Sequence, residues 1–439
     1  MRASQAIAAG LLSPFGAGFP AGALLGDEPQ GAAFDFLNMD MVIRGGGLDW
    51  QGDPNSKLTY TSPPTRWVRN ASGIYVSGTT LRCDHLADGT ALGLLIEGQF
   101  TNVLLRSQEF DNAAWTKTDT TVTANATTSP DGTANADLLT EGTAGTARTL
   151  QTGTATTASA AVSGSIFLKA SANVTWVSVA LRDGTGANGL ATWVNLSTGA
   201  IGTTSNIGTA TGSGAQSVQA ANGFWRVECW CTMPSGVSDL RLYVQSASAD
   251  GSGTRVNNAA YYAWQASAGL GARPSSPVVT TSAAVTRAAD DIYILLSALP
   301  YSATVGTLVA TFRVPNVTGN QYAVALTNGA TSERIAIASL SGTTKGIEIA
   351  SSSTVAQVTS GTLSANAVTK GAMAWALDDV AFAKGGSLGT LDTSAALAAP
   401  TRLHLGGRNG GSDPLYGHLQ SLVYLPRRAS NSELQAFTA

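Results

Sequence analysis

Short runs of alternating apolar and polar residues, separated by glycine-containing turns, recur along this chain and constrain its fold more than any other feature. Residues 165–169, 176–181 and 224–231 are such runs, and Asn188-Gly189 and Asn222-Gly223 are turn pairs between them. A period of two residues is that of a β-strand buried on one face. We therefore expect an all-β protein with two jelly-roll or β-sandwich domains in tandem.

The composition agrees with sheets and excludes several functional classes. Charged residues make up 12% of the chain, about half the usual ~25%, and small and β-branched residues take their place. The formal net charge is −3, and no basic block typical of a nucleic-acid-binding arm is present. No run of about 18 uncharged apolar residues occurs, so we expect no transmembrane span.

Changes in composition divide the chain into four parts. Residues 1–33 form an apolar segment that contains several prolines and glycines, and residues 34–102 read as a small β-rich connecting region. Residues 103–290 carry strand-like runs at intervals of about ten residues, which predicts a first sandwich, and residues 291–439 predict a second. No exact repeat is found, which argues against a solenoid or a propeller.

One helix is expected, at the end of the chain. Ser430 is followed three positions later by Glu433, a spacing typical of a capping box at a helix N-terminus. The helix would place Leu434 and Phe437 against the second sandwich.

Residues 1–33 are expected to be an extended docking arm that becomes ordered only against a partner protein. Three prolines prevent one continuous helix, and burial of apolar side chains would offset the entropy lost on binding. A flexible tail and a secretory signal, suggested by Arg2 before an apolar stretch, are the alternatives. The predicted docking residues are Leu11, Leu12, Phe15, Phe19, Leu24 and Leu25.

Part of the chain resembles phage and prophage tail-fibre and spike proteins. Residues 93–117, GLLIEGQFTNVLLRSQEFDNAAWTK, look like a signature common in that family. Further matching pieces follow in order at residues 129–134, 165–170, 222–227, 262–265 and 284–290. The resemblance covers about residues 34–290 and implies a jelly roll like that of carbohydrate-binding modules, and a role in the virion. After Trp264 the sequence departs from the family, so we expect no ion site there.

The last domain is similar to concanavalin A-like domains of the laminin-G type. Residues 403–407 (LHLGG), 416–425 (YGHLQSLVYL) and 430–437 carry this similarity, in that order. The fold hosts both binding proteins and enzymes, so the similarity does not decide between them.

The run at residues 224–231 presents two different faces. Trp225, Val227, Cys229 and Cys231 fall on one face and read as core. Phe224, Arg226, Glu228 and Trp230 fall on the other face. This second face combines aromatic and charged groups, so it is a candidate for a glycan-binding face, a subunit interface or a second packed layer.

Two histidines suggest a second candidate site. His404 and His418 each lie opposite the leucine-rich face of their predicted strands. If these strands pair, both imidazoles would share the outer face with Tyr424 and could line a ligand cleft. Solvated surface residues are the alternative.

The sequence offers no catalytic residues, cofactor site or metal site. A glycosidase needs two carboxylates about 5–9.5 Å apart, and the neighbours Asp290 and Asp291 would point to opposite faces of a strand. The motifs of nucleophile elbows, zinc peptidases and phosphate loops are missing. The remaining candidates for metal ligands, Cys83, Cys229 and Cys231, have no metal-ligand spacing and read as reduced thiols.

Together these features predict a structural virion protein, a spike or fibre of a bacteriophage-like particle assembled in the host cytoplasm. It would dock on other virion proteins through its N-terminal arm, form homo-oligomers (trimers by analogy with fibres) and present sandwiches that could bind a host-surface glycan. A polysaccharide depolymerase on a lectin-like scaffold and a secreted bacterial adhesin are the alternatives. Its place on the head or the tail stays open.

Overall fold

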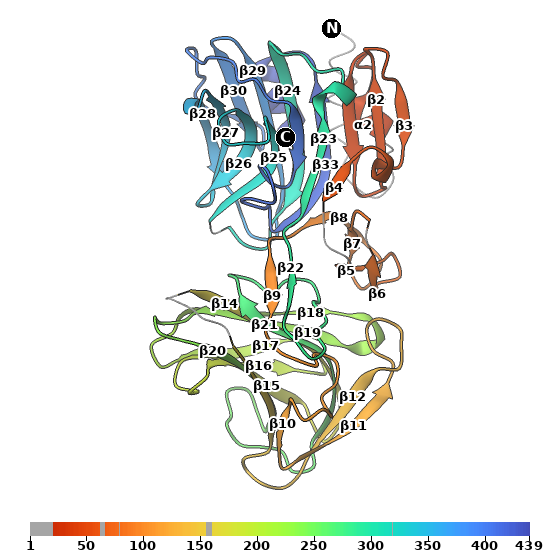
Figure 1. The fold of residues 1–439 in the computed structure, drawn as a ribbon, viewed down its shortest axis with the longest axis vertical. Coiled ribbons are helices and arrows are strands. Elements are labelled where there is room, and N and C mark those ends of the chain that lie inside the picture. Colours follow the sequence, from red (N-terminus) through yellow and green to blue (C-terminus); the bar gives the residue numbers. More distant parts are fainter. Residues whose placement is uncertain (1–20, 62–65, 79, 155–159, 318) are drawn as a thin grey trace.

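Two β-sandwiches lie end to end in this protein and are joined by a narrow two-stranded ribbon (Figure 1). The computed structural model describes residues 21–61, 66–78, 80–154, 160–317 and 319–439. Strand β9 (Phe100–Asn102) leads into the first sandwich and β22 (Val285–Arg287) leads out of it, and the two pair antiparallel. The all-β fold expected from the alternating sequence is confirmed.

The first sandwich consists of two antiparallel sheets of six strands each. One sheet contains, in spatial order, β10 (Thr116–Thr118), β13 (Arg148–Thr154), β20 (Asp239–Ala247), β15 (Trp176–Asp183), β16 (Gly189–Asn195) and β17 (Ile201–Ile207). The other contains β11 (Thr120–Thr127), β12 (Ala136–Glu141), β21 (Ala260–Leu270), β14 (Ala161–Ala172), β19 (Trp225–Thr232) and β18 (Thr211–Gln219).

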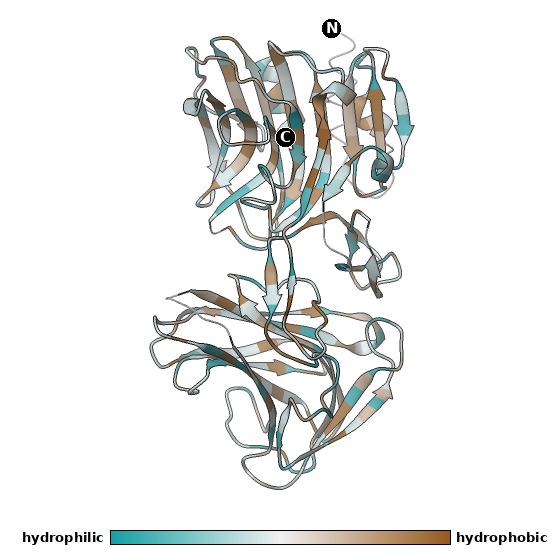
Figure 2. Cartoon of the chain, in the orientation of Figure 1, coloured by the Kyte–Doolittle hydropathy of each residue, from teal (hydrophilic) through white to brown (hydrophobic). Residues whose placement is uncertain are grey.

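The alternation of β19 places three of its four predicted core residues between the sheets, and Trp225 is the exception. Val227, Cys229 and Cys231 are buried in the core between the two sheets. Trp225 lies half-buried and donates its indole N–H to the carbonyl oxygen of Leu196 at 3.1 Å. Hydrophobic and hydrophilic residues alternate along many strands of both sandwiches (Figure 2), as expected where one face of a sheet is buried.

The second sandwich has one ten-stranded and one seven-stranded sheet. The larger contains, in spatial order, β3 (Trp50–Gly52), β2 (Asp40–Arg44), β1 (Gly31–Asp35), β33 (Gly417–Leu425), β24 (Val305–Arg313), β29 (Val368–Ala376), β30 (Asp379–Lys384) and β31 (Ser387–Leu388). Strand β8 (Ala91–Ile96) also pairs with β33, and β7 (Cys83–His85) pairs with β8. The smaller contains β28 (Ser353–Thr362), β27 (Thr343–Ala350), β26 (Arg334–Leu340), β25 (Asn320–Thr327), β32 (Arg402–Leu405), β23 (Asp291–Leu295) and β4 (Thr59–Thr61).

The second sandwich is discontinuous in sequence, which differs from the expected domain boundaries at residues 33, 102 and 290. Strand β1 pairs with β33, and β4 pairs with β23, so the segment 31–61 extends both sheets. A strand at the edge of a sheet presents a row of unpaired backbone N–H and C=O groups, and β1 and β4 hydrogen-bond to these groups. The hairpin of β5 (Arg66–Arg69) and β6 (Tyr75–Gly78) stays outside the large sheets, as does the β9–β22 ribbon.

Helices cover the outer face of the ten-stranded sheet. Helix α2 (Ala21–Leu25) packs Leu24 and Leu25 on the ten-stranded sheet of the same chain, and 2% and 0% of their surface is exposed. These two leucines are therefore part of the fold and not free for docking, whereas Leu11, Leu12, Phe15 and Phe19 lie outside the described residues.

The capped helix at the end of the chain is confirmed as α3 (Asn431–Thr438). Ser430 and Glu433 form both hydrogen bonds of the capping box, and Leu434 and Phe437 pack on the sheet. The remaining helical turns are η1 (Pro54–Ser56), η2 (Ala221–Gly223) and η3 (Leu296–Ala298). Among the described residues, no helix is long and apolar enough to cross a membrane.

Candidate functional site

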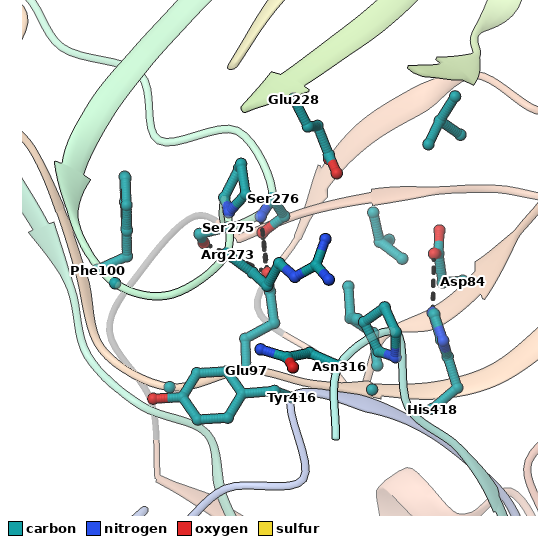
Figure 3. A pocket seen from close by; sticks show the side chains of 18 of the residues that line it. Asp84, Glu97, Phe100, Glu228, Arg273, Ser275, Ser276, Asn316, Tyr416 and His418 are labelled. Atoms are coloured by element: carbon teal, nitrogen blue, oxygen red, sulfur yellow. Dashed lines mark hydrogen bonds and ion pairs between the residues drawn. The ribbon is translucent and has the colours of Figure 1, made fainter. Parts of the chain in front are cut away.

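A pocket of about 510 Å³ lies at the junction of the two sandwiches, and we call it the junction pocket. Its lining comes from the connecting region (67–100), the first sandwich (216–228 and 270–276), the exit strand at Arg287, and the second sandwich (313–321, 366 and 416–418). The volume falls within the range of about 300–1,000 Å³ typical of small-molecule sites. Figure 3 shows that charged, amide and aromatic side chains face each other across it.

Strand β19 supplies an ion pair to one wall of the pocket. Arg226 Nη1 lies 2.7 Å from Glu228 Oε1, and Gln216 on the neighbouring strand β18 donates to Glu228 Oε2 at 2.5 Å. Burial alone would lower the pKa of Arg226, but the negative charge of Glu228 outweighs it and the pKa is raised. The guanidinium therefore stays charged in the pocket wall.

A second wall carries the group Arg69, Asp84 and His418. His418 Nε2 lies 3.0 Å from Asp84 Oδ2, and Arg69 donates to both oxygens of the same carboxylate. Burial by itself would raise the pKa of Asp84, but the hydrogen bond from His418 and the charge of Arg69 hold it well below its usual range. The three side chains come from β5, β7 and β33, so this group links the connecting region to the second sandwich.

Glu97 joins the connecting region to the first sandwich at the base of the pocket. Its carboxylate accepts from Arg82 at 2.7 Å, from Arg287 at 2.8 Å and from the hydroxyl of Ser276 at 2.6 Å. Burial would raise the pKa of Glu97, but Arg287, Arg82 and Ser276 together hold it far below its ordinary value. This carboxylate therefore stays ionised although it is almost fully buried.

Asp290 extends these contacts into the second sandwich. Arg82 Nη2 lies 2.7 Å from Asp290 Oδ2, and Arg66 pairs with the other oxygen. The hydroxyl of Tyr60, on β4, donates to Asp290 Oδ1 at 3.0 Å. We call Arg66, Arg82, Glu97, Arg287 and Asp290 the junction network, because it connects both sandwiches behind the pocket.

Aromatic side chains complete the pocket. Trp67 and Tyr75 pack with Phe167 and Trp264 of the first sandwich and form an apolar wall. Tyr416 is 45% exposed and lies at the edge of the pocket, close to the backbone of Gly98. A side chain at Gly98 would collide with the Tyr416 ring, so the absence of a Cβ at Gly98 allows this close approach.

The predicted face of β19 divides into two environments. Phe224 is fully buried against Phe167 and Trp264 and forms a second packed layer. Arg226 and Glu228 line the junction pocket, whereas Trp230 lies just outside its lining.

The prediction that His404, His418 and Tyr424 line one cleft is wrong. Strands β32 and β33 belong to opposite sheets of the second sandwich and do not pair. His404 is buried, with its Nδ1 3.2 Å from Asp291 Oδ1, and lies outside the pocket lining. His418 lines the junction pocket, and Tyr424 lies in the core, where its hydroxyl accepts from the backbone N–H of Ser302 at 2.9 Å.

A β-bulge explains why Tyr424 faces inward. Phe312 pairs with Leu419 and Thr311 pairs with Ser421, so Gln420 is an extra residue on β33. One extra residue reverses the alternation beyond it, and His418 and Tyr424 therefore point to opposite faces.

The sequence interpretation missed most of the charged residues of the pocket. Arg69, Asp84, Glu97 and Arg273 were not selected, nor was Tyr416. A usable signal existed, because the segment 66–97 concentrates charges in a chain that has few of them. The neighbours Asp290 and Asp291 contact different partners, Arg82 and His404, and do not form a catalytic pair with each other.

Among the described residues, no group of three or more histidine, cysteine, aspartate or glutamate side chains is placed to hold a metal ion. Cys83, Cys229 and Cys231 are free thiols. Burial raises the pKa of Cys83 to about 11, which opposes thiolate chemistry there.

Several solved structures are distantly similar to part of this chain. No family model and no curated protein sequence matches the chain. The CBM40 of a Ruminococcus gnavus IT-sialidase, solved with α2,3-sialyllactose, is 14% identical; the match covers 31% of this chain and 84% of that one, with a TM-score of 0.28. Domain 4 of AbnA, a GH43 arabinanase from Geobacillus stearothermophilus, is 13% identical, with coverages of 34% and 73% and a TM-score of 0.29. The NanB sialidase of Streptococcus pneumoniae is 13% identical, with coverages of 33% and 26% and a TM-score of 0.28. Scores this low assign neither a family nor a ligand to the chain.

Proposed function

We propose that this chain is a structural protein of a bacteriophage-like particle that binds a host-surface glycan in its junction pocket. The observation that carries the binding role is the composition of the pocket. Its walls combine hydrogen-bonding side chains such as Arg226, Glu228 and His418 with the exposed ring of Tyr416. Sugars present hydroxyl groups at their edges and apolar C–H faces, and such a pocket matches both.

The virion role is supported by the sequence resemblance across residues 34–290. The junction network adds a physical reason, because a spike or fibre must hold its domains at a fixed angle under load. Assembly in the host cytoplasm and a trimeric state belong to the same proposal and follow from the family likeness alone.

We further propose that the pocket binds without cleaving. A glycosidase needs one carboxyl group that is protonated near neutral pH. Asp84 and Glu97 both have pKa values held below their ordinary range by cationic neighbours, so neither serves as that acid. Glu228, the third carboxylate of the pocket, is ion-paired with Arg226 at 2.7 Å. Incubation with host capsule or lipopolysaccharide should release no oligosaccharide; reproducible release would establish the depolymerase alternative.

The binding role can be tested by blocking the pocket. Ala272 is exposed and lines the pocket, so Ala272→Trp should obstruct it, whereas Ala249→Trp places the same bulk on an exposed turn elsewhere. Binding of host-surface polysaccharide to immobilised protein should weaken at least about tenfold in the first variant, a loss of about 1.4 kcal/mol, and stay unchanged in the second. Equal binding by both variants, or no binding by the wild type, would contradict the proposal.

The docking role can be tested by truncation, provided that the cut leaves the fold intact. Residues from Ala21 onwards pack in the second sandwich, so the deletion must stop at residue 20. The truncated chain should fold with unchanged thermal stability but fail to enter particles. Normal incorporation would show that residues 1–20 do not dock.

A further inference from the structure

The junction pocket has an excess of positive charge. Five arginines and three carboxylates line it, although the whole chain has a net charge of −3. Asp84 pairs with Arg69, Glu228 with Arg226, and Glu97 with Arg287. The other two arginines, Arg273 and Arg313, have no ion-pair partner among the described residues. One comes from the loop after β21 and the other from the end of β24, so each sandwich contributes one.

Arg273 is held in a defined orientation by Trp230. Its guanidinium carbon lies 3.5 Å from the centre of the indole ring, a close cation–π contact. Trp230 itself packs against Gly214 on the paired strand β18, where a Cβ would collide with the indole. The aromatic platform is therefore fixed by the sheet, and the arginine rests on it.

Stacking leaves the edge of the guanidinium free to bind. A guanidinium donates its hydrogen bonds in its own plane, so an indole under its face does not occupy them. The side chain of Arg273 extends into the pocket (Figure 3), and its buried Nε has no hydrogen-bond partner among the residues that the structure describes. Glu228 lies nearby but pairs with Arg226 instead.

We propose that Arg273 binds the anionic group of an acidic sugar, so that the glycan recognised by the junction pocket is negatively charged. The edge of a guanidinium forms two parallel hydrogen bonds with a carboxylate or a phosphate, and either group on a sugar ring would satisfy it. Arg313 adds a second positive charge from the other sandwich. This inference rests on the proposed glycan-binding function and assigns its ligand class.

The test compares sugars that differ mainly in one group. Glucuronate has a carboxylate at position 6, glucose 6-phosphate has a phosphate there, and glucose has neither. Galacturonate, galactose and N-acetylneuraminate extend the series to other ring shapes. Each is titrated into the full chain and followed by ligand-observed NMR. At least one acidic sugar should bind about ten times more tightly than its neutral counterpart, and that preference should fall at high salt. The relative affinities of glucuronate and glucose 6-phosphate identify the anion.

Variants assign the effect to Arg273. Arg273→Gln should weaken binding of the acidic sugar by about 10- to 100-fold and leave the neutral sugar unchanged, because one charge-assisted pair is lost. Arg402→Gln is the matched control, since Arg402 also stacks on an aromatic ring, that of Tyr293 at 4.9 Å, but lies outside the pocket lining. If Arg273→Gln lowers thermal stability, Arg313→Gln gives an independent test and should reduce the same preference several-fold.

The outcomes separate this inference from the proposed function. Equal binding of acidic and neutral sugars, or a preference that Arg273→Gln leaves unchanged, would overturn the acidic ligand while the glycan-binding role stands. Absence of binding to every sugar and to host polysaccharide would overturn both.

Discussion

Replacing Glu348 with glutamine should remove a loss of stability that the wild type shows as the pH rises from 5 to 8. Glu348 lies on β27 inside the second sandwich and has no exposed surface. One oxygen accepts from the backbone N–H of Ala398 at 3.0 Å, and the other has no hydrogen-bond partner among the described residues. Burial raises the pKa of Glu348 to about 7, from an ordinary 4.5.

The size of the effect follows from the two pKa values. A pKa raised in the folded state means that the folded protein holds the proton more tightly than the unfolded chain. The free energy of unfolding is therefore highest below pH 4.5, falls between pH 4.5 and 7, and is lower by a constant amount at higher pH. The full difference is about 3 kcal/mol, of which about 2.5 kcal/mol falls between pH 5 and 8.

Glutamine keeps the acceptor for Ala398 but cannot ionise. Its amide nitrogen replaces the oxygen without a partner and costs about 1–3 kcal/mol at every pH. The informative quantity is therefore the change with pH of the stability difference between the two proteins, and not its value at one pH.

Urea unfolding of the second sandwich at pH 5, 6, 7 and 8 provides the measurement, because Trp375 in its core reports that transition. The glutamine variant should gain about 2.5 kcal/mol relative to the wild type from pH 5 to 8. Glu109→Gln serves as the control, because it removes a carboxylate from the first sandwich and leaves the second sandwich unchanged. A stability difference that stays constant across this range would refute the burial argument.

Three further predictions concern the junction and the last helix. Glu97→Gln should destabilise the protein by about 3–5 kcal/mol in thermal unfolding, because it leaves Arg82 and Arg287 with reduced charge compensation. The difference from wild type should shrink as the pH falls from 4.5 towards the lowered pKa of Glu97, and a constant difference over that range would argue against an ionised carboxylate. Gly98→Ala should displace the ring of Tyr416 and weaken glycan binding in the assay described above without unfolding the protein, and unchanged affinity would remove Tyr416 from the site. Ser430→Ala should cost about 1 kcal/mol in urea unfolding by removing the helix cap, whereas a loss near zero would mean that packing alone fixes α3.

Local sequence patterns predicted the elements but not their partners. The alternation in β19 and the capping box at Ser430 each depend on neighbouring residues, and both were predicted correctly except for Trp225, which is half-buried. The pairing of β1 with β33 joins segments almost 400 positions apart in sequence, and periodicity carries no information about such pairs. The bulge at Gln420 shifts the alternation of β33 by one residue. A strict period of two does not include this shift, so the prediction placed Tyr424 on the wrong face.

The pocket was hard to predict for the same reason. Arg82 meets Asp290 across 208 sequence positions, and Glu97 meets Ser276 across 179. A charged residue in isolation reads as a surface residue, because burial of an unpaired charge is very costly. Only the fold shows that these residues are buried, and that each has found a partner of opposite charge or a hydrogen bond.

The position of these charges also bears on how the pocket works. The chain has few charged residues, and yet the whole junction network is buried between the sandwiches. Buried ion pairs contribute little net stability, because desolvation offsets their attraction, but a misplaced partner leaves a buried charge unpaired at a cost of several kcal/mol. The network therefore acts mainly on orientation: it penalises any other angle between the sandwiches. A pocket whose walls come from both sandwiches is then already formed before a ligand arrives, and the binding free energy is not reduced by domain closure.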